Sequence, residues 1–279
     1  AAALALTAKR RAGRTGWANA AQTIYPGHIQ IGTAAARAGN IRAQFLYSFS
    51  FSEEPNAERG SRNVTLYGSG NVTVPGDIRT DTQGGSAGHV LIDHQGDLST
   101  GIINADTRGY GVNYPHAGNV TLNGGDSSGN ASVSGIQASL TSGKSNDDNT
   151  RRTVAISNYH DVVVGDITAR YEGDPSNGRF YGSHVEINQN ITGDISITGE
   201  VDVRSYKDHS HSGYLKLVCG GTITLGELDL DKVLHARIDS GSGASVITGA
   251  ITDFDTTTDL TGSGTKSDPY KTAETRLRA

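Results

Sequence analysis

The sequence predicts an all-β protein, a parallel β-helix (β-solenoid) in which each coil contributes one strand to each of three sheets. Short runs of alternating apolar and polar residues recur along the chain, and glycines or polar turns separate them. Alternation with period two is typical of strands, and recurrence every few tens of residues is typical of solenoids. A single coil cannot bury its apolar face alone, whereas stacked copies can.

One repeat near the middle of the chain shows all three runs. His184–Ile187 is the first run, Gly193–Ile197 is the second, and Gly199–Val203 is the third. Polar turns and a glycine separate them, so we expect three short strands joined by corners. This repeat is the template for the rest of the chain.

The composition suits a thin solenoid. Glycine accounts for 37 of 279 residues without a three-residue period, which excludes a collagen helix. Only 35% of the residues are hydrophobic and 6% are aromatic, as expected for an interior one side chain wide. Because no run of about 18 apolar residues occurs, we expect no transmembrane segment.

Residues 1–27 are expected to form a basic arm outside the solenoid. Ala2–Arg11 has helix propensity, so the arm is expected to be partly helical. Residues 1–52 hold six Lys or Arg and no acid, so the net charge of −5 leaves −11 on the remainder. An acidic body would repel a phosphate backbone, so nucleic acid is not an expected partner. The arm is either a solvated tail or a subunit contact, with candidate contact residues Lys9, Arg10, Arg11 and Arg14.

Residues 28–62 are expected to form a degenerate first coil that caps the solenoid. His28–Ile31 and Gly39–Phe45 resemble weak copies of the regular runs. Aromatic residues then alternate with smaller ones, and terminal repeats are commonly atypical. We expect this aromatic strand to plug the open end of the tube with Phe45, Tyr47, Phe49 and Phe51.

Residues 63–255 are expected to form about seven regular coils. In every first run the second and fourth residues are apolar, as in Val64 and Leu66. Side chains alternate across a strand, so these residues must point into the tube. The first runs begin at Asn63, His89, Asn119, Thr153, His184, Tyr214 and His235.

A glycine separates the second run from the third in most coils. Glycine adopts backbone conformations that other residues avoid, so we expect these positions to form the sharp corners between the second and third sheets. The corner glycines are Gly76, Gly101, Gly135, Gly165, Gly199 and Gly226.

Coil length varies almost entirely in the loop after the third run. These loops are long in the middle coils, so insertions gather along one edge, which in solenoids is often the working surface. Their aromatic residues either bind a ligand or pack on one another to fix the loops. The candidate binding residues are Tyr110, Tyr114, His116, Tyr171, Phe180, Tyr181, Tyr206, His209 and His211. Residues 256–279 are polar, which is typical of a linker or a loosely packed end.

Runs such as Gly70–Ile78 and Gly118–Leu122 resemble the repeats of filamentous-haemagglutinin-type exoproteins, and similar sequences occur in autotransporter passengers. The resemblance covers about residues 63–255. It implies a right-handed parallel β-helix from a secreted or surface-bound bacterial protein. The expected location is therefore extracellular or on the bacterial cell surface.

Several acidic residues are candidates for catalytic or metal-binding groups. Pectin-degrading enzymes share this architecture and use paired carboxylates, but Asp147–Asp148 is interpreted as a solvated turn because adjacent residues in an extended loop point apart. Aspartates also recur at Gly-Asp positions of the coils and could bind a cation as a ladder. The favoured interpretation is a turn aspartate that bonds its own backbone. These residues are Asp77, Asp97, Asp166 and Asp194.

Histidine and cysteine patterns are interpreted as structural. His209 and His211 beside Asp208 could bind a metal, but a polar loop is the favoured interpretation. His89, His184 and His235 share the position that opens the first run, where Asn and Tyr also occur. Cys219 is the one cysteine of the chain and is expected to be a small buried side chain. We therefore expect no metal and no cofactor.

The sequence thus predicts a non-enzymatic structural or adhesive solenoid that assembles head-to-tail into a surface fibre or matrix. The expected partners are further copies of the chain and a surface polysaccharide. The alternatives are a carbohydrate-binding module that uses the loop aromatics and, behind it, a polysaccharide lyase or hydrolase.

Overall fold

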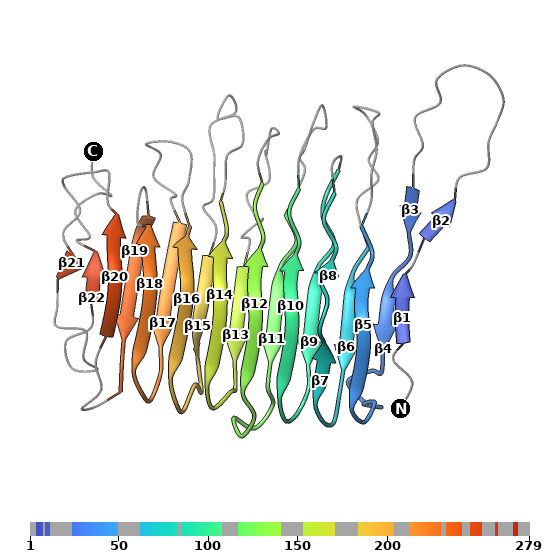
Figure 1. Ribbon diagram of the computed structural model, residues 1–279, viewed down its shortest axis with the longest axis horizontal. Coiled ribbons are helices and arrows are strands. Elements are labelled where there is room, and N and C mark those ends of the chain that lie inside the picture. Colours follow the sequence, from blue (N-terminus) through green and yellow to red (C-terminus); the bar gives the residue numbers. More distant parts are fainter. Residues whose placement is uncertain are drawn as a thin grey trace, which may run out of the picture.

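The protein is an all-β solenoid whose successive coils stack side by side, as the ribbon shows (Figure 1). The computed structural model describes residues 4–7, 9–11, 24–49, 62–82, 85–107, 117–140, 153–170, 184–203, 213–229, 233–241, 246–252, 260–261 and 270–272. Within these residues all regular elements are strands, and no helix has the length and apolarity that crossing a bilayer requires. The predicted fold class is confirmed.

The first runs form one sheet, here called sheet 1. The predicted first runs are all present as strands, paired in parallel with unbroken order along the chain. They are β6 (Val64–Tyr67), β9 (Val90–Asp93), β11 (Val120–Asn123), β13 (Thr153–Ser157), β15 (His184–Gln189), β17 (Gly213–Val218) and β19 (Val233–Asp239), preceded by β4 (Ile29–Ile31).

The second and third runs share a single sheet, here called sheet 2. The prediction of three sheets, with these runs as strands of two separate sheets, is wrong: in most coils they are joined into one strand that continues through the corner glycine. Hydrogen bonding between coils persists across the bend, so the two faces belong to one sheet. The strands are β5 (Ile41–Tyr47), β10 (Leu98–Asn104), β12 (Ala131–Gln137), β14 (Val162–Thr168), β16 (Ile195–Asp202), β18 (Ile223–Asp229) and β20 (Val246–Thr252).

One coil keeps its second and third runs apart. There, β7 (Val72–Val74) and β8 (Ile78–Arg79) both pair with β10, and Pro75 follows β7. Proline has no N–H to donate to the ladder, which accounts for the interruption.

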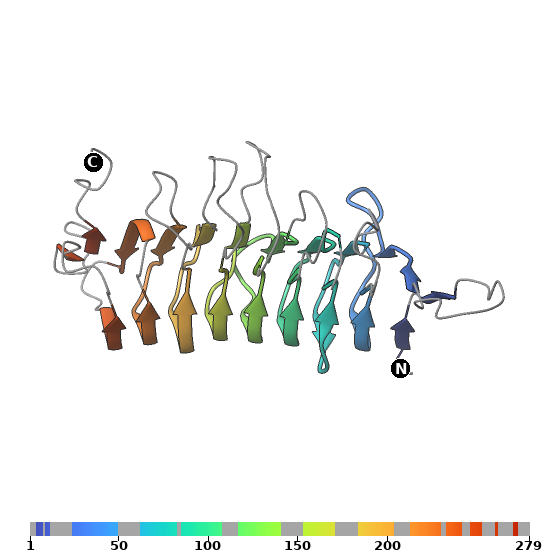
Figure 2. The ribbon, with the colours of Figure 1, turned by 90° about the horizontal axis from the view of Figure 1, so that it is seen from above.

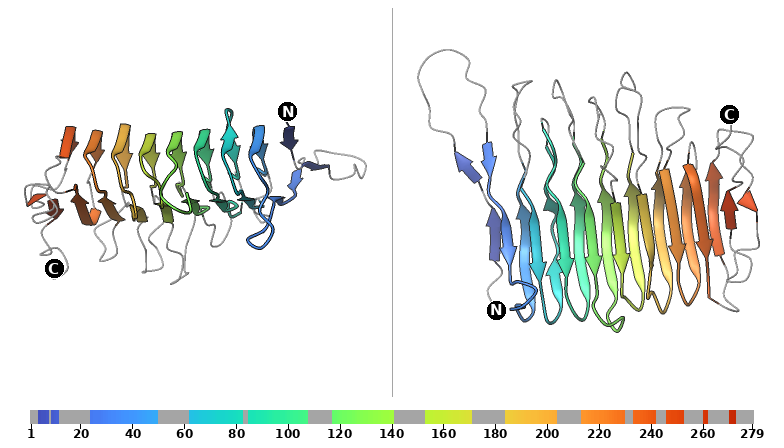
Figure 3. Two further views of the ribbon diagram at one scale, coloured as in Figure 1. Left: turned by 90° about the horizontal axis from the view of Figure 1, so that it is seen from below. Right: turned by 180° about the vertical axis from the view of Figure 1, so that it is seen from behind.

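The core lies between the two sheets, which appear as separate layers when the solenoid is viewed along its flat faces (Figures 2 and 3). The second and fourth residues of the described first runs are buried, as predicted; Val64, Val90 and Val120 follow one another in register and are at most 1% exposed. Each rung therefore packs on the next, which is how a repeat with a small apolar face gains a continuous core.

The predicted aromatic plug is wrong, because the bend changes which residues face inward. In β5, Ile41 and Ala43 point into the core before the bend, and Leu46 does so after it. The same change of phase carries Phe45, Tyr47 and Phe49 to the outer surface, where they are half-buried. Phe51 lies outside the described residues.

The role assigned to the corner glycines is also wrong. The described glycines with positive φ are Gly32, Gly85, Gly96 and Gly125, and none of them is a predicted corner glycine. Most of the corner positions, with Gly135 as the exception, need glycine for a different reason, close approach to the neighbouring coil. A Cβ on Gly101 would lie 2.7 Å from the carbonyl oxygen of Gly76.

Both chain ends add strands to the sheets. Instead of a helix, the predicted arm contains β1 (Leu4–Thr7), parallel to β5, and β2 (Lys9–Arg11), antiparallel to β3 (Ile24–Pro26). The tail forms β22 (Tyr270–Thr272), antiparallel to β19, and β21 (Leu260–Thr261), antiparallel to β22.

Candidate functional site

The long loops leave the solenoid from positions that stack on one another. Thr82, Thr107 and Leu140 form successive parallel bridges, and the N–H of Leu140 donates to the carbonyl of Arg170. The starting points of the loops are therefore spaced like neighbouring strands, about 4.8 Å apart. Sequence reasoning located this edge correctly.

The candidate residues of that edge lie beyond the part of the chain that the structure describes. These are Tyr110, Tyr114, His116, Tyr171, Phe180, Tyr181, Tyr206, His209 and His211, as well as Asp147–Asp148 and Asp208. Of the candidate arm residues, Lys9, Arg10 and Arg11 form β2, whereas Arg14 also lies outside the described residues.

Polar contacts hold the loop bases in place. The Thr107 hydroxyl donates to the Gly85 carbonyl at 2.6 Å, and the Ser139 N–H donates to Asp106 at 2.6 Å. Arg170 pairs with the fully buried carboxylate of Asp202. The buried charge is paired and the hydroxyl is hydrogen-bonded. Removing a partner would leave a buried charge unpaired at high energetic cost, so these contacts hold the starting points of the loops in place.

The histidine position that opens the first run is structural, as predicted. The N–H of Asn63 donates to His28 Nδ1 at 3.2 Å, that of His89 to Asn63 Oδ1 at 2.9 Å, and that of Asn119 to His89 Nδ1 at 2.9 Å. Each side chain accepts from the backbone of the next coil. His and Asn are interchangeable at this position because His Nδ1 and Asn Oδ1 are both hydrogen-bond acceptors at a similar distance from the backbone.

A second ladder opens the second run, and sequence reasoning missed it. The side-chain oxygen of Asn or Asp accepts the backbone N–H of the matching residue one coil later, at 2.7 to 3.1 Å. The interpretation that Asp97 and Asp194 bond their own turn is therefore wrong. It is also wrong for Asp77 and Asp166, which follow corner glycines and accept the N–H of Ile102 at 3.2 Å and of Glu200 at 2.9 Å in the next coil. Asn or Asp recurs directly before the second runs from β5 to β16, and this recurrence is the signal that could have revealed the ladder. The ladder runs through Asn40, Asn71, Asp97, Asn130, Asp161, Asp194 and Thr222.

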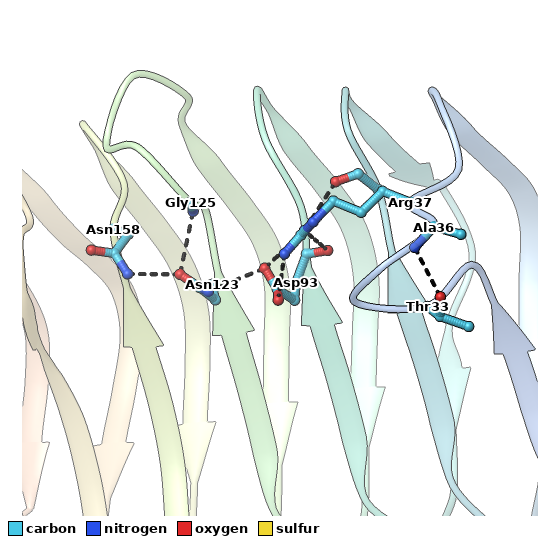
Figure 4. Close-up of polar contacts among 8 residues, drawn as sticks. Thr33, Ala36, Arg37, Asp93, Asn123, Gly125 and Asn158 are labelled. Carbon is cyan, nitrogen blue, oxygen red and sulfur yellow. Dashed lines mark hydrogen bonds and ion pairs between the residues drawn. The ribbon is translucent and has the colours of Figure 1, made fainter.

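A third ladder follows the ends of the first runs and begins at an arginine (Figure 4). Asn123 Nδ2 donates to Asp93 Oδ1 at 3.1 Å, Asn158 Nδ2 to Asn123 Oδ1 at 2.7 Å, and Asn190 Nδ2 to Asn158 Oδ1 at 2.8 Å. Arg37 grips Asp93 with two hydrogen bonds, at 2.8 and 3.1 Å. The ladder of asparagine side chains therefore starts at a carboxylate, Asp93, whose charge is neutralised by the bidentate ion pair with Arg37.

A buried histidine–tyrosine pair connects two turns. His94 Nε2 and Tyr159 Oη are 2.9 Å apart, and both side chains are fully buried. His94 Nδ1 lies 3.3 Å from the carbonyls of Gly70 and Gln95, so Nδ1 carries the proton and Nε2 accepts from the tyrosine. Burial lowers the pKa of His94 and raises that of Tyr159.

The outward aromatic cluster of β5 is closed by an arginine. The rings of Phe45 and Tyr47 are stacked with centroids 4.6 Å apart, and the Arg79 guanidinium lies 5.9 Å from Tyr47 and 5.2 Å from Phe49. Arg79 is held in turn by Asp81 at 2.7 Å. Because ring faces are covered by one another and by the cation, the cluster fastens two coils rather than offering a flat platform.

The remaining titratable residues also have structural partners. Cys219 is buried, as predicted, and its Sγ donates to the Gly221 carbonyl at 3.2 Å; burial raises the pKa of the thiol. Among the residues that the structure describes, no group of His, Cys, Asp and Glu is arranged to hold a metal ion. The recurring polar side chains of the corners act as links between coils.

Comparison with protein-family models, with curated proteins and with solved structures found no match to this chain.

Proposed function

We propose that this chain is an extracellular, non-enzymatic β-solenoid of a bacterial surface, structural or adhesive, that assembles head-to-tail into a fibre or matrix. The observation that carries the proposal is strand direction: sheet 2 is parallel from β1 to β20. A parallel stack has two different ends, so copies that join end to end share one direction, as a fibre requires. The resemblance of residues 63–255 to haemagglutinin-type repeats supports the surface location.

The adhesive part of the proposal rests on the loop edge. The bases of the loops stack in a line at Thr82, Thr107, Leu140 and Arg170. A line of loops on a rigid rod presents many similar contacts at once, and linked contacts bind more strongly than separate ones. The rod then acts as the support and the edge as the contact surface.

The assembly state of the purified full-length chain tests the fibre. We expect sedimentation that depends on concentration, and filaments in negative-stain electron micrographs. A protomer-sized species over a wide range of concentrations would exclude assembly.

Carbohydrate binding by the loop edge is the second candidate, favoured by the aromatic residues in these loops, because tyrosine rings stack on sugars while their hydroxyls form hydrogen bonds. On a glycan array, Tyr114→Ala and Tyr181→Ala are expected to lose binding while the unfolding midpoint is retained. Thr65→Ala, on the outer side of β6, is the matched control. Equal binding by all variants would remove the loop aromatics from the proposal.

Absence of catalysis is tested by incubation with acidic polysaccharides, with and without calcium. Release of shortened or unsaturated sugars would overturn the non-enzymatic role and favour the lyase or hydrolase alternative.

A further inference from the structure

The two outermost strands of sheet 2 define a joint between copies. We infer that β20 of one copy pairs in parallel with β1 of the next, an inference that rests on the proposed head-to-tail assembly and names its contact. Within the described residues, β1 and β20 each have one neighbour, so each has an outer edge that pairs with no strand. Unpaired parallel edges are templates for another chain.

Strand direction permits this joint without distortion. β1 runs parallel to β5, and β20 runs parallel to β18. Every neighbour between them in sheet 2 is also parallel. A second copy placed end to end in the same direction therefore presents β1 to β20 with the polarity of the ladder already in the solenoid.

The direction of the backbone N–H groups shows what each edge offers. Residues that point into the core donate to the next coil: the N–H of Val72 reaches the Asp97 carbonyl at 2.9 Å, and that of Leu98 reaches Asn130 at 2.8 Å. Thr248 of β20 pairs with Leu225 of β18, an inward-pointing residue, and so has the same position in the hydrogen-bond ladder. The Thr248 N–H is thus directed away from β18, to the open edge.

The opposite edge offers the complementary groups. Residues between the inward-pointing ones donate to the preceding coil, as the N–H of Gly101 does to the Gly76 carbonyl at 3.2 Å. Ala5 lies between Leu4 and Leu6, which are opposite Ala43 and Leu46 across an irregularity in the register at the bend of β5. By this alternation the Ala5 N–H is directed away from β5.

The two ends are also stepped in a complementary way (Figures 1 and 3). At the N-terminal end, sheet 2 extends one strand further than sheet 1, because β1 lies beyond β5 while sheet 1 ends at β4. At the other end, β22 and β21 extend sheet 1 beyond β19. When β20 of one copy pairs with β1 of the next, β22 of the first copy occupies the position in sheet 1 that lies opposite β1. The next position in sheet 1 is taken by β4 of the incoming copy. β21, which pairs with β22 through only two residue pairs, is displaced from that position.

Two proline variants of the full-length chain test the joint, because proline at an outward N–H blocks an edge without removing an internal hydrogen bond. Thr248→Pro blocks the β20 edge, and Ala5→Pro blocks the β1 edge. Each variant alone is expected to lose filaments and to sediment as a protomer. Mixed in equal amounts they are expected to give a dimer of twice the protomer mass that does not grow, because one unblocked β20 meets one unblocked β1.

The outcomes separate the joint from the assembly itself. Filaments from both variants, equal to those of the unsubstituted chain, would overturn the joint and leave head-to-tail assembly standing. A protomeric unsubstituted chain at all concentrations would overturn the assembly and the joint together. Circular dichroism melting of each variant, expected within a few degrees of the unsubstituted chain, identifies a variant that has merely unfolded; Thr248→Ser and Ala5→Gly, which keep the N–H, are the matched controls and are expected to form filaments.

Discussion

His94 and Tyr159 are fully buried, and they connect turns that are two coils apart. The turn between them, after β11, carries Gly124 and Gly125, and a Cβ on Gly124 would lie 2.7 Å from the Tyr159 ring. A larger residue there would displace the ring. The hydrogen bond therefore depends on a small residue in a coil to which neither partner belongs.

Stability is expected to fall as the pH is lowered, because His94 is buried as the neutral tautomer. Burial lowers its pKa, whereas the hydrogen bonds to the Gln95 and Gly70 carbonyls and, less strongly, the charges of Asp93 and Asp97 raise it; burial is the larger effect. The unfolded chain therefore takes up a proton near pH 6.5 while the folded chain does not. The contribution of neutral His94 to the free energy of unfolding is fully present above that pH. It is lost as the pH falls towards the pKa of His94 in the folded chain, by up to about 1.4 kcal/mol per pH unit.

Urea unfolding between pH 7.5 and 4.5 measures this loss. His94→Gln is neutral throughout and is expected to be less stable at pH 7.5 but to have a flatter profile. His160→Gln, at an exposed position, is the control and is expected to follow the unsubstituted chain. A profile of His94→Gln as steep as that of the unsubstituted chain would show that other groups carry the pH dependence.

At the scale of the element, the bend in sheet 2 decides which glycines are indispensable. A Cβ on Gly165 would fall well inside contact distance of the Ser134 carbonyl oxygen, a backbone atom that cannot rotate away. A Cβ on Gly135 would meet nothing nearer than 3.4 Å. Two glycines that have equivalent places in the sequence pattern are therefore not equivalent in the fold.

Substitution by alanine is expected to separate the two positions. Gly165→Ala should destabilise the solenoid by about 1 to 3 kcal/mol, the usual range for overpacking a close contact. Gly135→Ala should change stability by less than about 1 kcal/mol. Chemical denaturation of both variants provides the measurement. Equal loss of stability in the two variants would indicate that glycine is needed at these positions for its backbone conformation and not for close approach to the neighbouring coil.

The strands could be predicted from sequence because their inward residues obey a strict alternation, and the described first runs lie where the pattern placed them. The ladders could not be derived in the same way, because an Asp or Asn before a strand fits a local turn as well as a bond to the next coil. The outward orientation of Phe45 and Tyr47 does not follow from simple alternation, because the bend in β5 changes which residues face inward.

At the scale of the whole molecule, charge is distributed along the axis. The basic strand β2 belongs to the N-terminal end, and Arg42 is exposed on β5. Exposed carboxylates occur at intervals along the rest of the solenoid, at Asp97, Asp126, Asp166, Asp194 and Glu227, and Glu227 lies on β18, next to the last strand of sheet 2. In the proposed head-to-tail stack, the basic end of one copy approaches the end of the next that carries Glu227, an attraction between unlike charges.

Salt is therefore expected to weaken the joint. Screening shortens the range of exposed charges from about 10 Å at 0.1 M to about 3 Å at 1 M, so the attraction between ends should largely vanish over that interval. Sedimentation at 0.1 and 1 M NaCl is expected to show filaments or oligomers at low salt and a severalfold higher critical concentration at high salt. In the triple variant Lys9→Gln, Arg10→Gln, Arg11→Gln, assembly at low salt should already resemble that of the unsubstituted chain at high salt. Assembly that strengthens with salt would instead identify the joint as apolar and leave the basic strand without a part in it.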